Sequence, residues 1–146
     1  MLLTIPGIPK PKQSMRARIL TAKSGKSFIH AYQKKEVVEN ERNIRMIIKE
    51  QLPSDFIPFT KGVRISTLHY LFPPVSSLKK SELEKIKNGE IVHKTTKPDL
   101  TDNLNKGLFD AMQGIVFLND SQVCEMNDVK KYYSFTPGII ITIEEL

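Results

Sequence analysis

The sequence predicts an α+β fold in which a small mixed β-sheet packs with two main helices. Residues 33–51 lack glycine and proline and repeat valine and isoleucine at helical spacing. Residues 62–72 instead place Val63, Ile65 and Leu71 on the same parity, as a long strand does. The few predicted strands do not alternate strictly with helices, and this arrangement is typical of the α+β class.

Prolines, glycines and helix caps divide the rest of the chain. Pro6, Gly7 and Pro9 interrupt the first apolar segment, which favours an edge strand that runs into an irregular basic segment. Gly114 follows the last periodic residue of the second main helix and is expected to be its C-cap. The predicted elements are an edge strand over 1–9, a basic hairpin with strands at 16–20 and 27–31, a helix over 33–51, a strand over 62–72, a short helix over 81–87, an irregular segment over 91–98, a helix over 101–113, and strands over 122–135 and 139–143.

Length and composition exclude several classes of protein. The chain has 146 residues, a formal net charge of +6 and a single cysteine. Cys124 alone cannot form an internal disulfide, and a zinc site built from thiolates is excluded. The first residues lack the basic and apolar regions of a signal peptide, and no window is apolar enough to span a bilayer. We therefore expect a soluble, cytoplasmic protein that folds as one domain over residues 1–146.

Basic residues are concentrated toward the N-terminal end. Residues 1–50 hold 11 lysines and arginines and 4 acidic residues, whereas residues 51–146 hold 11 and 12. The first 35 residues hold 8 basic side chains and no acidic one. This asymmetry favours a polyanion as the partner, and a solvated basic surface that aids solubility is the simpler alternative.

The second main helix has two different faces. An apolar residue recurs at every fourth position, at Leu100, Leu104, Leu108 and Met112. On the other side Lys106 lies between two carboxylates, Asp102 and Asp110, each one turn away. The simplest interpretation is a solvated face with ion pairs between residues four apart, and with Asp99 or Asp102 as the helix cap.

A further acidic position, Asp120, follows this helix in the loop after the apolar residues 115–118. Cleavage of a phosphodiester by a hard divalent ion needs two or three carboxylates that converge on one point. Asp99, Asp102 and Asp120 could supply these ligands. Repulsion between such carboxylates and a phosphate would be offset by lysines close by in the sequence, namely Lys94, Lys97 and Lys106.

The same region contains four short blocks in a fixed order. They are Lys97-Pro98-Asp99, Asp102-Asn103-Leu104-Asn105-Lys106, Asp110-Ala111-Met112-Gln113-Gly114 and Asp120-Ser121-Gln122-Val123. These blocks resemble the Lys-Pro-Asp, Asp-Asn-Leu-x-Lys, Asp-Ala-Leu-x-Gly and Asp-Asp-Ser-Gln-Val blocks of the RusA family of crossover-junction endodeoxyribonucleases, Holliday-junction resolvases often carried by phages and prophages. The similarity also reaches residues 7–12 with Arg16 and Arg18, and therefore covers most of the chain.

The resemblance implies a homodimeric, Mg²⁺-dependent endonuclease of DNA recombination and repair that introduces paired nicks in a four-way DNA junction. It implies Asp99, Asp102 and Asp120 as metal ligands and, together with Lys106, as catalytic residues; Mn²⁺ is expected to be able to replace Mg²⁺. No membrane and no small-molecule cofactor are expected. The acidic active-site segment spans about residues 97–123, and the basic arm and hairpin span about residues 9–31. The expected DNA contacts are Lys10, Lys12, Arg16, Arg18, Lys94 and Lys97.

Two positions depart from the family pattern. The family usually has one residue between the first two aspartates, whereas Leu100 and Thr101 both stand there in this chain. We interpret Thr101 as an inserted residue that bulges the start of the helix. Asn119 stands where the family commonly has an aspartate, and a neutral amide there still permits Asp120 to bind a metal. Asp110 is expected to have an orienting or structural role.

Two other functions remain open at this point. In the first, the chain is a non-catalytic accessory protein that binds branched DNA, with acidic residues that only cap and solvate the helix and with Thr101 marking a degenerate site. Asp120 separates this alternative from an enzyme, because helix capping has no use for a carboxylate in the later loop. The second is a nuclease with a broader specificity for flaps and other branched DNA, which would share every active-site feature.

Overall fold

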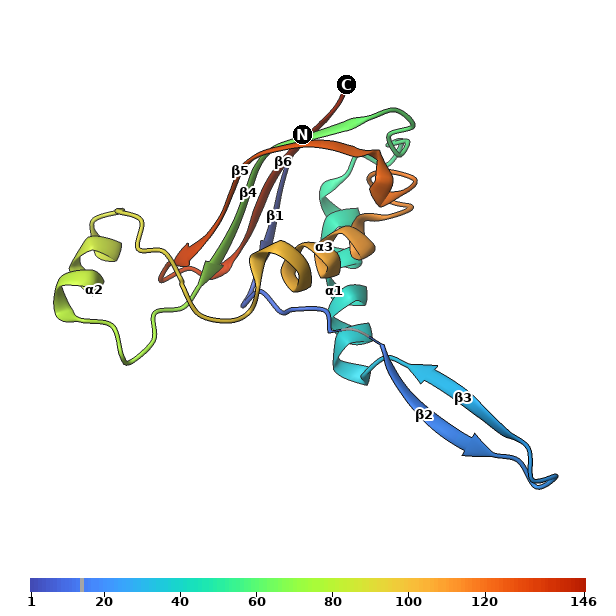
Figure 1. Cartoon of the computed structure of the whole chain (residues 1–146). Helices are drawn as coiled ribbons and strands as arrows, with labels where there is room; N and C mark the ends of the chain where they lie inside the picture. The colour runs from blue at the N-terminus through green and yellow to red at the C-terminus, as the bar shows by residue number, and fades with distance from the viewer. Residues whose placement is uncertain (14) are drawn as a thin grey trace.

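The computed structural model describes residues 1–13 and 15–146 (Figure 1). The elements are β1 (Leu2–Pro6), β2 (Arg16–Thr21), β3 (Ser27–Tyr32), α1 (Lys35–Gln51), β4 (Val63–Phe72), α2 (Lys80–Lys87), the π-helical turn η1 (Leu100–Leu104), α3 (Asn105–Met112), the 3-10 turn η2 (Asp120–Gln122), β5 (Val123–Tyr133) and β6 (Gly138–Glu145). The predicted α+β class is confirmed, and the predicted elements agree with the observed ones to within a few residues. In the described part of the chain, no helix is both long and apolar enough to cross a membrane.

Four strands form the main sheet in the order β1-β6-β4-β5. β6 pairs antiparallel with β1 and β4, whereas β4 and β5 are parallel. β1 therefore occupies an edge, as its flanking prolines predict. Parallel neighbours need a long crossover between them. Here the crossover contains α2, η1 and α3, and it carries the chain from the end of β4 back to the start of β5 (Figure 1).

The core lies between the inner face of this sheet and the helices α1 and α3. Alternate residues of β6 point into it, and Ile139, Ile141 and Ile143 are buried. The predicted apolar stripe of the second main helix is confirmed, since Leu104, Leu108 and Met112 are buried and Leu100 packs against the core. Burial of each large apolar side chain contributes roughly 1.5–3 kcal/mol, so this stripe sets the rotation of α3 about its own axis.

Two polar contacts fix α3 further. The hydroxyl of the buried Tyr70 in β4 donates a hydrogen bond of 2.9 Å to Oδ1 of Asn105 at the start of the helix. At the other end, Nη1 of Arg45 in α1 donates to the carbonyl oxygens of Ala111 and Gln113, at 3.2 and 3.0 Å. A cation at a helix C-terminus satisfies carbonyls that have no partner within the helix. Gly114 follows with φ of 76°, in the left-handed conformation that the predicted cap requires.

The basic segment after β1 crosses the outer side of α3. The backbone N–H of Lys12 donates to the carbonyl oxygen of Asn103 at 3.0 Å. A Cβ atom at Gly107 would lie 3.2 Å from Cβ of Lys12, so the absent side chain permits this close approach. Nζ of Lys12 pairs with Asp110 at 2.7 Å and with Glu41 at 2.9 Å. Burial lowers the pKa of Lys12, but the hydrogen bonds that it donates to Asp110 and Glu41, together with their negative charges, outweigh this effect and raise the pKa.

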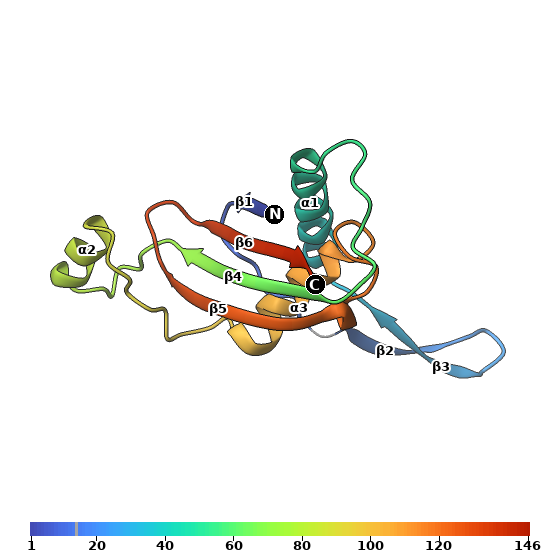
Figure 2. The same ribbon diagram turned by 90° about the horizontal axis from the view of Figure 1, so that it is seen from above.

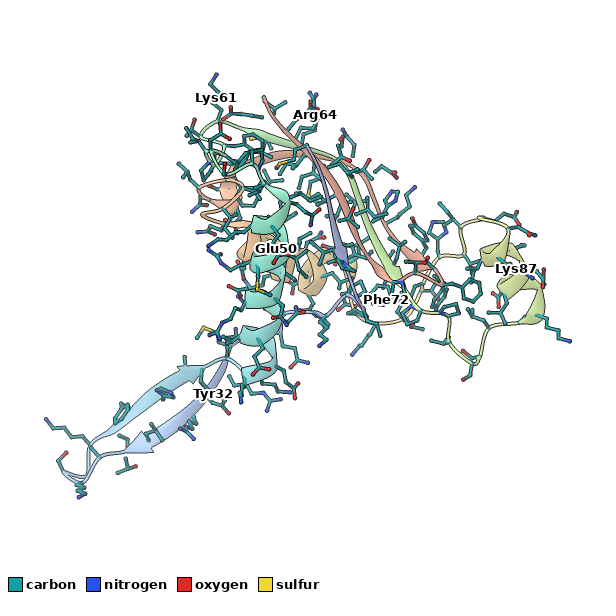
Figure 3. All side chains as sticks on the ribbon, turned by 180° about the vertical axis from the view of Figure 1, so that it is seen from behind. Tyr32, Glu50, Lys61, Arg64, Phe72 and Lys87 are labelled. Atoms are coloured by element: carbon teal, nitrogen blue, oxygen red, sulfur yellow. The ribbon has the colours of Figure 1, made fainter. Side chains whose placement is uncertain are left out.

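The hairpin of β2 and β3 is confirmed, and it projects from the rest of the molecule. Its register runs from Arg16 opposite Tyr32 to Thr21 opposite Ser27. The views in Figures 2 and 3 show the hairpin at one end of the molecule and α2 at the other, with the sheet between them. Both extensions are sequence-local structures, and neither contributes strands to the main sheet.

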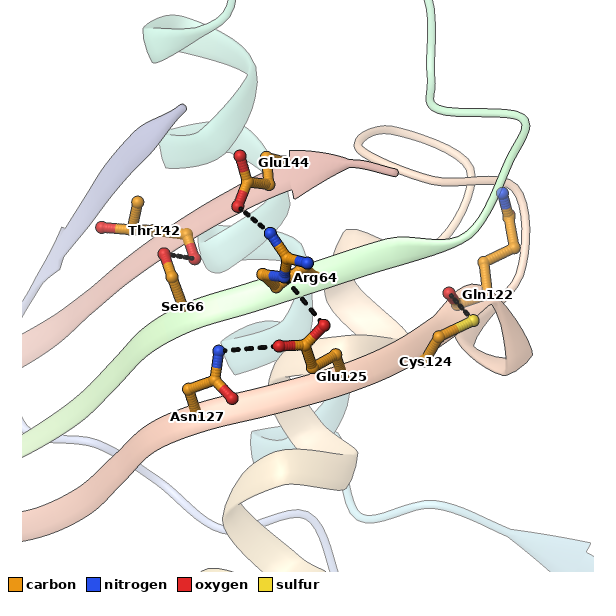
Figure 4. A network of polar contacts seen from close by, with 8 residues as sticks. All are labelled: Arg64, Ser66, Gln122, Cys124, Glu125, Asn127, Thr142 and Glu144. Carbon is orange, nitrogen blue, oxygen red and sulfur yellow. Dashed lines mark hydrogen bonds and ion pairs between the residues drawn. The ribbon is translucent and has the colours of Figure 1, made fainter.

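The outer face of the sheet is polar and carries a network of ion pairs (Figure 4). Arg64 in β4 reaches Glu125 of β5 at 2.8 Å and Glu144 of β6 at 3.2 Å. Hydrogen bonds from Arg64 and then from Asn127 hold the pKa of Glu125 below its ordinary value. The network therefore links three adjacent strands on the side that the helices leave open.

Lys12 gives a test of the contact between the basic segment and α3. We expect Lys12→Met to lower the free energy of unfolding by about 1–2 kcal/mol, because it leaves two partly buried carboxylates without their cation. Chemical denaturation followed by circular dichroism measures the change.

Lys35→Met is the matched control for this substitution. Lys35 also pairs with a glutamate, Glu39 at 3.7 Å, but its side chain is 89% exposed. Exposed pairs contribute little, so we expect a change below roughly 0.5 kcal/mol. Equal effects of the two substitutions would contradict a structural role for Lys12.

Candidate functional site

The start of the second main helix holds the first two predicted site residues. Asp99 is the N-cap of η1, and the N–H of Leu104 donates to its carbonyl oxygen at 3.1 Å, five residues away. A π-helical turn accommodates one residue more than an α-helical turn. The predicted bulge around Thr101 is therefore confirmed: the chain absorbs the extra residue as a π turn and then continues as a regular α-helix.

The carboxylates of Asp99 and Asp102 are exposed, and capping does not account for them. Asp99 occupies the N-cap position, but its side chain makes no capping hydrogen bond. Among residues 1–13 and 15–146, no ion pair joins Lys106 to Asp102 or to Asp110. The simple interpretation, a helix face stabilised by its own ion pairs, is thus not what the structure contains. Asp110 pairs instead with Lys12, in agreement with its expected structural role.

Lys131 in β5 holds the loop that leads to Asp99. Its Nζ donates to the carbonyl oxygens of Thr96 and Pro98, both at 2.7 Å. Burial and the nearby charge of Lys94 lower the pKa of Lys131, and Asp99 acts in the opposite direction. Lys131 was not among the predicted site residues, because nothing in a strand pattern shows that a lysine near the end of the strand bonds a distant loop.

Asp120 begins the short turn η2, which precedes β5. Oδ1 of Asn119 accepts a hydrogen bond from the N–H of Ser121 at 2.9 Å, and the N–H of Asn119 donates to Oε1 of Gln122 at 2.7 Å. This reciprocal arrangement is a capping box. It explains Asn119, since an amide oxygen caps the turn as a carboxylate oxygen would. The exposed side chain of Asp120 is left outside these hydrogen bonds.

Gln122 connects this turn to the loop before β4 by hydrogen bonds, a role that was not predicted from the sequence. Its Nε2 donates to the carbonyl oxygens of Phe59 and Lys61, at 2.9 and 2.7 Å. The asparagine three residues before Gln122 was the available signal, because Asn-x-x-Gln is a capping-box pattern. Asp120 therefore sits on a rigid turn rather than on a free loop.

The structure does not bring Asp120 together with Asp99 and Asp102. Asp120 lies just before the start of β5, whereas Lys131, which holds the loop before Asp99, lies near its end (Figure 1). At about 3.3 Å per residue, the strand from Val123 to Lys131 spans roughly 26 Å. In the described residues, no three histidine, cysteine, aspartate or glutamate side chains lie close enough to hold a metal ion. The expected convergence of three carboxylates is not formed within one chain.

The predicted DNA contacts fall into two groups. Lys10, Arg16, Arg18 and Lys97 are exposed. Lys12 is 15% exposed and is already paired with two carboxylates of the same chain. Lys94 is half-buried: its Nζ lies over the rings of Phe72 and Tyr133 and donates to Thr96 at 2.6 Å.

A depression beside Asp99 joins the basic segment to the acidic one. Its volume is about 360 Å³, and it is lined by Pro11, Gln13, Lys97, Pro98, Asp99 and Asn103. One wall is thus the arm and the other is the start of the helix. This geometry presents a carboxylate and an exposed lysine, Lys97, to the same ligand, which suits a phosphate accompanied by a hard cation.

Comparison with known proteins agrees with the sequence blocks. The sequence profile described as endodeoxyribonuclease RusA matches residues 6–144. The chain is also 30% identical over 103 residues, 70% of each chain, to the uncharacterized protein YqaN of Bacillus subtilis (strain 168). The profile covers the basic arm, the helix start and the turn that carries Asp120, and the chain therefore belongs to the RusA family of endodeoxyribonucleases.

Proposed function

We propose that this protein is a divalent-metal-dependent endodeoxyribonuclease that acts as a homodimer and introduces paired nicks in four-way DNA junctions. The observation that carries the proposal is the exposed pair of carboxylates, Asp99 and Asp102, at the start of the helix. Within the described chain neither a helix N–H nor a lysine engages them. Exposed carboxylates without such partners, close in sequence to Lys97 and Lys106, suit a site that binds a cation and a phosphate together.

The chemistry of the donor set fits a hard divalent cation, because carboxylate oxygens are its preferred ligands. When bound, Mg²⁺ or Mn²⁺ supplies a water activated for attack on phosphorus and neutralises charge on the departing 3′ oxygen. Asp99 and Asp102 would hold the cation. Lys106, one turn after Asp102, would stabilise negative charge on the phosphate. Lys131 would act as a positioning residue, since it bonds the backbone of the loop that ends at Asp99.

The position of Asp120 supports a dimeric site. Within one chain, Asp120 precedes the start of β5, whereas the loop before Asp99 is bonded by Lys131, roughly 26 Å further along that strand. A second copy, related by a two-fold axis, would bring the partner's Asp120 to Asp99 and Asp102 of the first chain and would form two equal sites. Two sites related by symmetry also suit the cutting of two strands of one junction.

Asp120→Asn tests the role of the later carboxylate. We expect it to lower junction cleavage by at least about 10³-fold, because removal of a metal-binding charge removes the activated water, and to change junction affinity by less than about twofold. Cleavage is measured on a labelled four-way junction with Mg²⁺ and with EDTA, and binding with Ca²⁺ in place of Mg²⁺. Loss of binding with normal cleavage of the bound fraction would contradict the assignment.

A mixture of two inactive variants tests whether the site is shared between chains. We expect Asp99→Asn and Asp120→Asn to be inactive alone and to recover cleavage when they are unfolded together and refolded. In the mixed dimer one site carries both substitutions, and the other is intact, so nicks should appear on one strand only.

Two results would argue against this proposal. A mixture that stays inactive although mixed dimers form would contradict a site shared between two chains. Tight junction binding by the wild-type protein without nicks in Mg²⁺ or Mn²⁺ would favour the accessory protein.

The exposed arginines of β2 give a test of DNA binding. Each cation that contacts a phosphate releases counterions, so log K falls with log salt concentration by about one unit of slope per contact. We expect Arg16→Gln together with Arg18→Gln to reduce the slope by about 2, on junction and on linear duplex.

Lys61→Gln is the control for this slope. Lys61 is also exposed, but it follows the C-terminal end of α1, whereas the hairpin lies at the N-terminal end of that helix (Figure 3). We expect Lys61→Gln to leave the slope of log K against log salt concentration unchanged. A fall in this slope per removed charge equal to that of the arginine variant would show a non-specific effect of net charge.

A further inference from the structure

The hairpin of β2 and β3 is a two-stranded ribbon whose two faces differ in chemistry. Cross-strand partners share a face, so the register assigns every residue to one side. One side, the cationic face, carries Arg16, Arg18, His30 and Tyr32 near the base of the ribbon and the apolar pair Leu20 and Phe28 toward its tip. The other side, the apolar face, carries Ala17, Ile19, Ile29 and Ala31, and ends in the polar pair Thr21 and Ser27. On the cationic face the guanidinium of Arg18 lies 5.5 Å from the ring centroid of Tyr32, which orders both side chains.

The apolar face has no cover within the described chain. Ile19 and Ile29 stand opposite each other and are 74% and 75% exposed. Among residues 1–13 and 15–146, no third strand pairs with the ribbon and no helix covers it, and in Figure 3 its side chains extend into open space on both sides. A ribbon of two strands is marginally stable alone. Two adjacent exposed isoleucines on such an element point to a surface that is covered in the working complex.

The charge of the ribbon indicates which partner covers its apolar face. The ribbon and its tip carry Arg16, Arg18, Lys23 and Lys26, and residues 1–35 contain no acidic side chain. The ribbon of a second copy would bring the same four cations close to these, and their repulsion opposes such pairing. DNA satisfies both faces, because its phosphates pair with the cations and its bases offer flat apolar surfaces. Proteins that bend DNA insert apolar side chains between base steps in this way.

We propose that the ribbon enters the branch point of a DNA junction, where Ile19 and Ile29 pack against unstacked bases while the cationic face contacts phosphates. This inference rests on the proposed function, which makes branched DNA the substrate. The groove of a linear duplex covers one face of a ribbon and leaves the other in water. At a branch point DNA surrounds the ribbon, so both faces are contacted. The apolar face thereby selects branched over linear DNA.

The ribbon is anchored next to the candidate site, which gives the inserted position a consequence for cleavage. The Lys12 N–H donates to the carbonyl oxygen of Asn103 in η1. Nε2 of Gln33 donates to the carbonyl oxygen of Gln13 at 3.5 Å and so joins the two ends of the ribbon base to each other. Each strand has six residues and extends about 20 Å. A ribbon seated in the branch point therefore holds the carboxylates at a set distance from it.

The test uses a four-way junction with 2-aminopurine beside the branch point, and Ca²⁺ in place of Mg²⁺. The fluorescence of this base rises when it loses its stacking neighbour. We expect the wild-type protein to raise it severalfold. Ile19→Thr together with Ile29→Thr should abolish the rise and weaken junction binding about tenfold, with duplex binding changed less than about twofold. Threonine is β-branched and keeps the strand propensity of both positions.

Two controls separate this effect from general losses. Ile57→Thr with Ile91→Thr removes two exposed isoleucines outside the ribbon, and these residues are 78% and 45% exposed; we expect wild-type behaviour. Arg18→Gln should weaken junction and duplex binding alike. A ribbon disordered by the threonines would weaken duplex binding as Arg18→Gln does, whereas Ile19→Leu, which retains an apolar side chain, should keep the fluorescence rise.

The outcomes test the inference about the ribbon separately from the proposed nuclease function. Equal losses on junction and duplex, an unchanged fluorescence rise in the double variant, or conversion of a dimer to monomers by that variant in sedimentation would overturn the inference. Binding to anionic lipid vesicles that needs Ile19 and Ile29, without any effect on junction fluorescence, would do the same. A wild-type protein that raises the fluorescence but never nicks in Mg²⁺ would overturn the proposed function and leave the inference standing.

Discussion

The helix that starts at η1 and continues as α3 buries one apolar stripe against the sheet, at Leu104, Leu108 and Met112. This contact fixes the rotation of the helix and therefore where its other side chains point. With the stripe turned inward, Asp102 and Lys106 face solvent, and Asp110 faces the basic segment that crosses the helix. Tyr70 and Arg45 bond opposite ends of the same helix and prevent it from sliding along the sheet. The candidate site is therefore held by a core rather than by a loop, which suits groups that must keep their geometry when a charged ligand arrives.

The charges of the molecule are divided between structure and binding. Lys12, Glu41, Asp110 and Lys131 are engaged in the fold: the first three form one cluster, and the last bonds backbone carbonyls. The carboxylates at the helix start and the arginines of the ribbon have no such partners in the described chain. A polyanion with an accompanying cation would satisfy both sets, because the metal neutralises repulsion between carboxylate and phosphate. Pairing the first set within the fold leaves the second available to DNA.

The separation of Asp120 from the other two aspartates would give the proposed dimer a role in the chemistry. Strand β5 places the two halves of the proposed site at its opposite ends, so a single chain holds incomplete halves. In a symmetric pair each chain would complete the site of the other. Activity would then depend on protein concentration, and cleavage would be tied to the presence of two sites. The projecting ribbon adds a second requirement, that the DNA surround it on both faces.

Much of the fold was predictable because it depends on local patterns. The helical period of residues 33–51, the alternation in residues 62–72 and the four-residue repeat from Leu100 to Met112 reflect which side of each element is buried. The bulge at Thr101 was predicted from the resemblance to the family, which usually has one residue fewer between the first two aspartates. The blocks of polar residues likewise indicated the family and the carboxylates. These features are properties of short stretches and do not depend on how the elements are arranged.

The tertiary structure decided which of those residues meet. Asp99 and Asp120 are close in sequence, and we expected them to converge, yet the crossover through α3 carries the chain to the other end of a strand before Asp120 appears. Lys12 lies in a basic segment and was predicted to contact DNA, but its side chain is paired with Glu41 and Asp110. Lys131 bonds a loop more than thirty residues away in sequence. The sequence by itself determined the elements, their buried faces and the chemical groups available, because these follow from local periodicity. The distances between those groups came only from long-range packing, which no local pattern records.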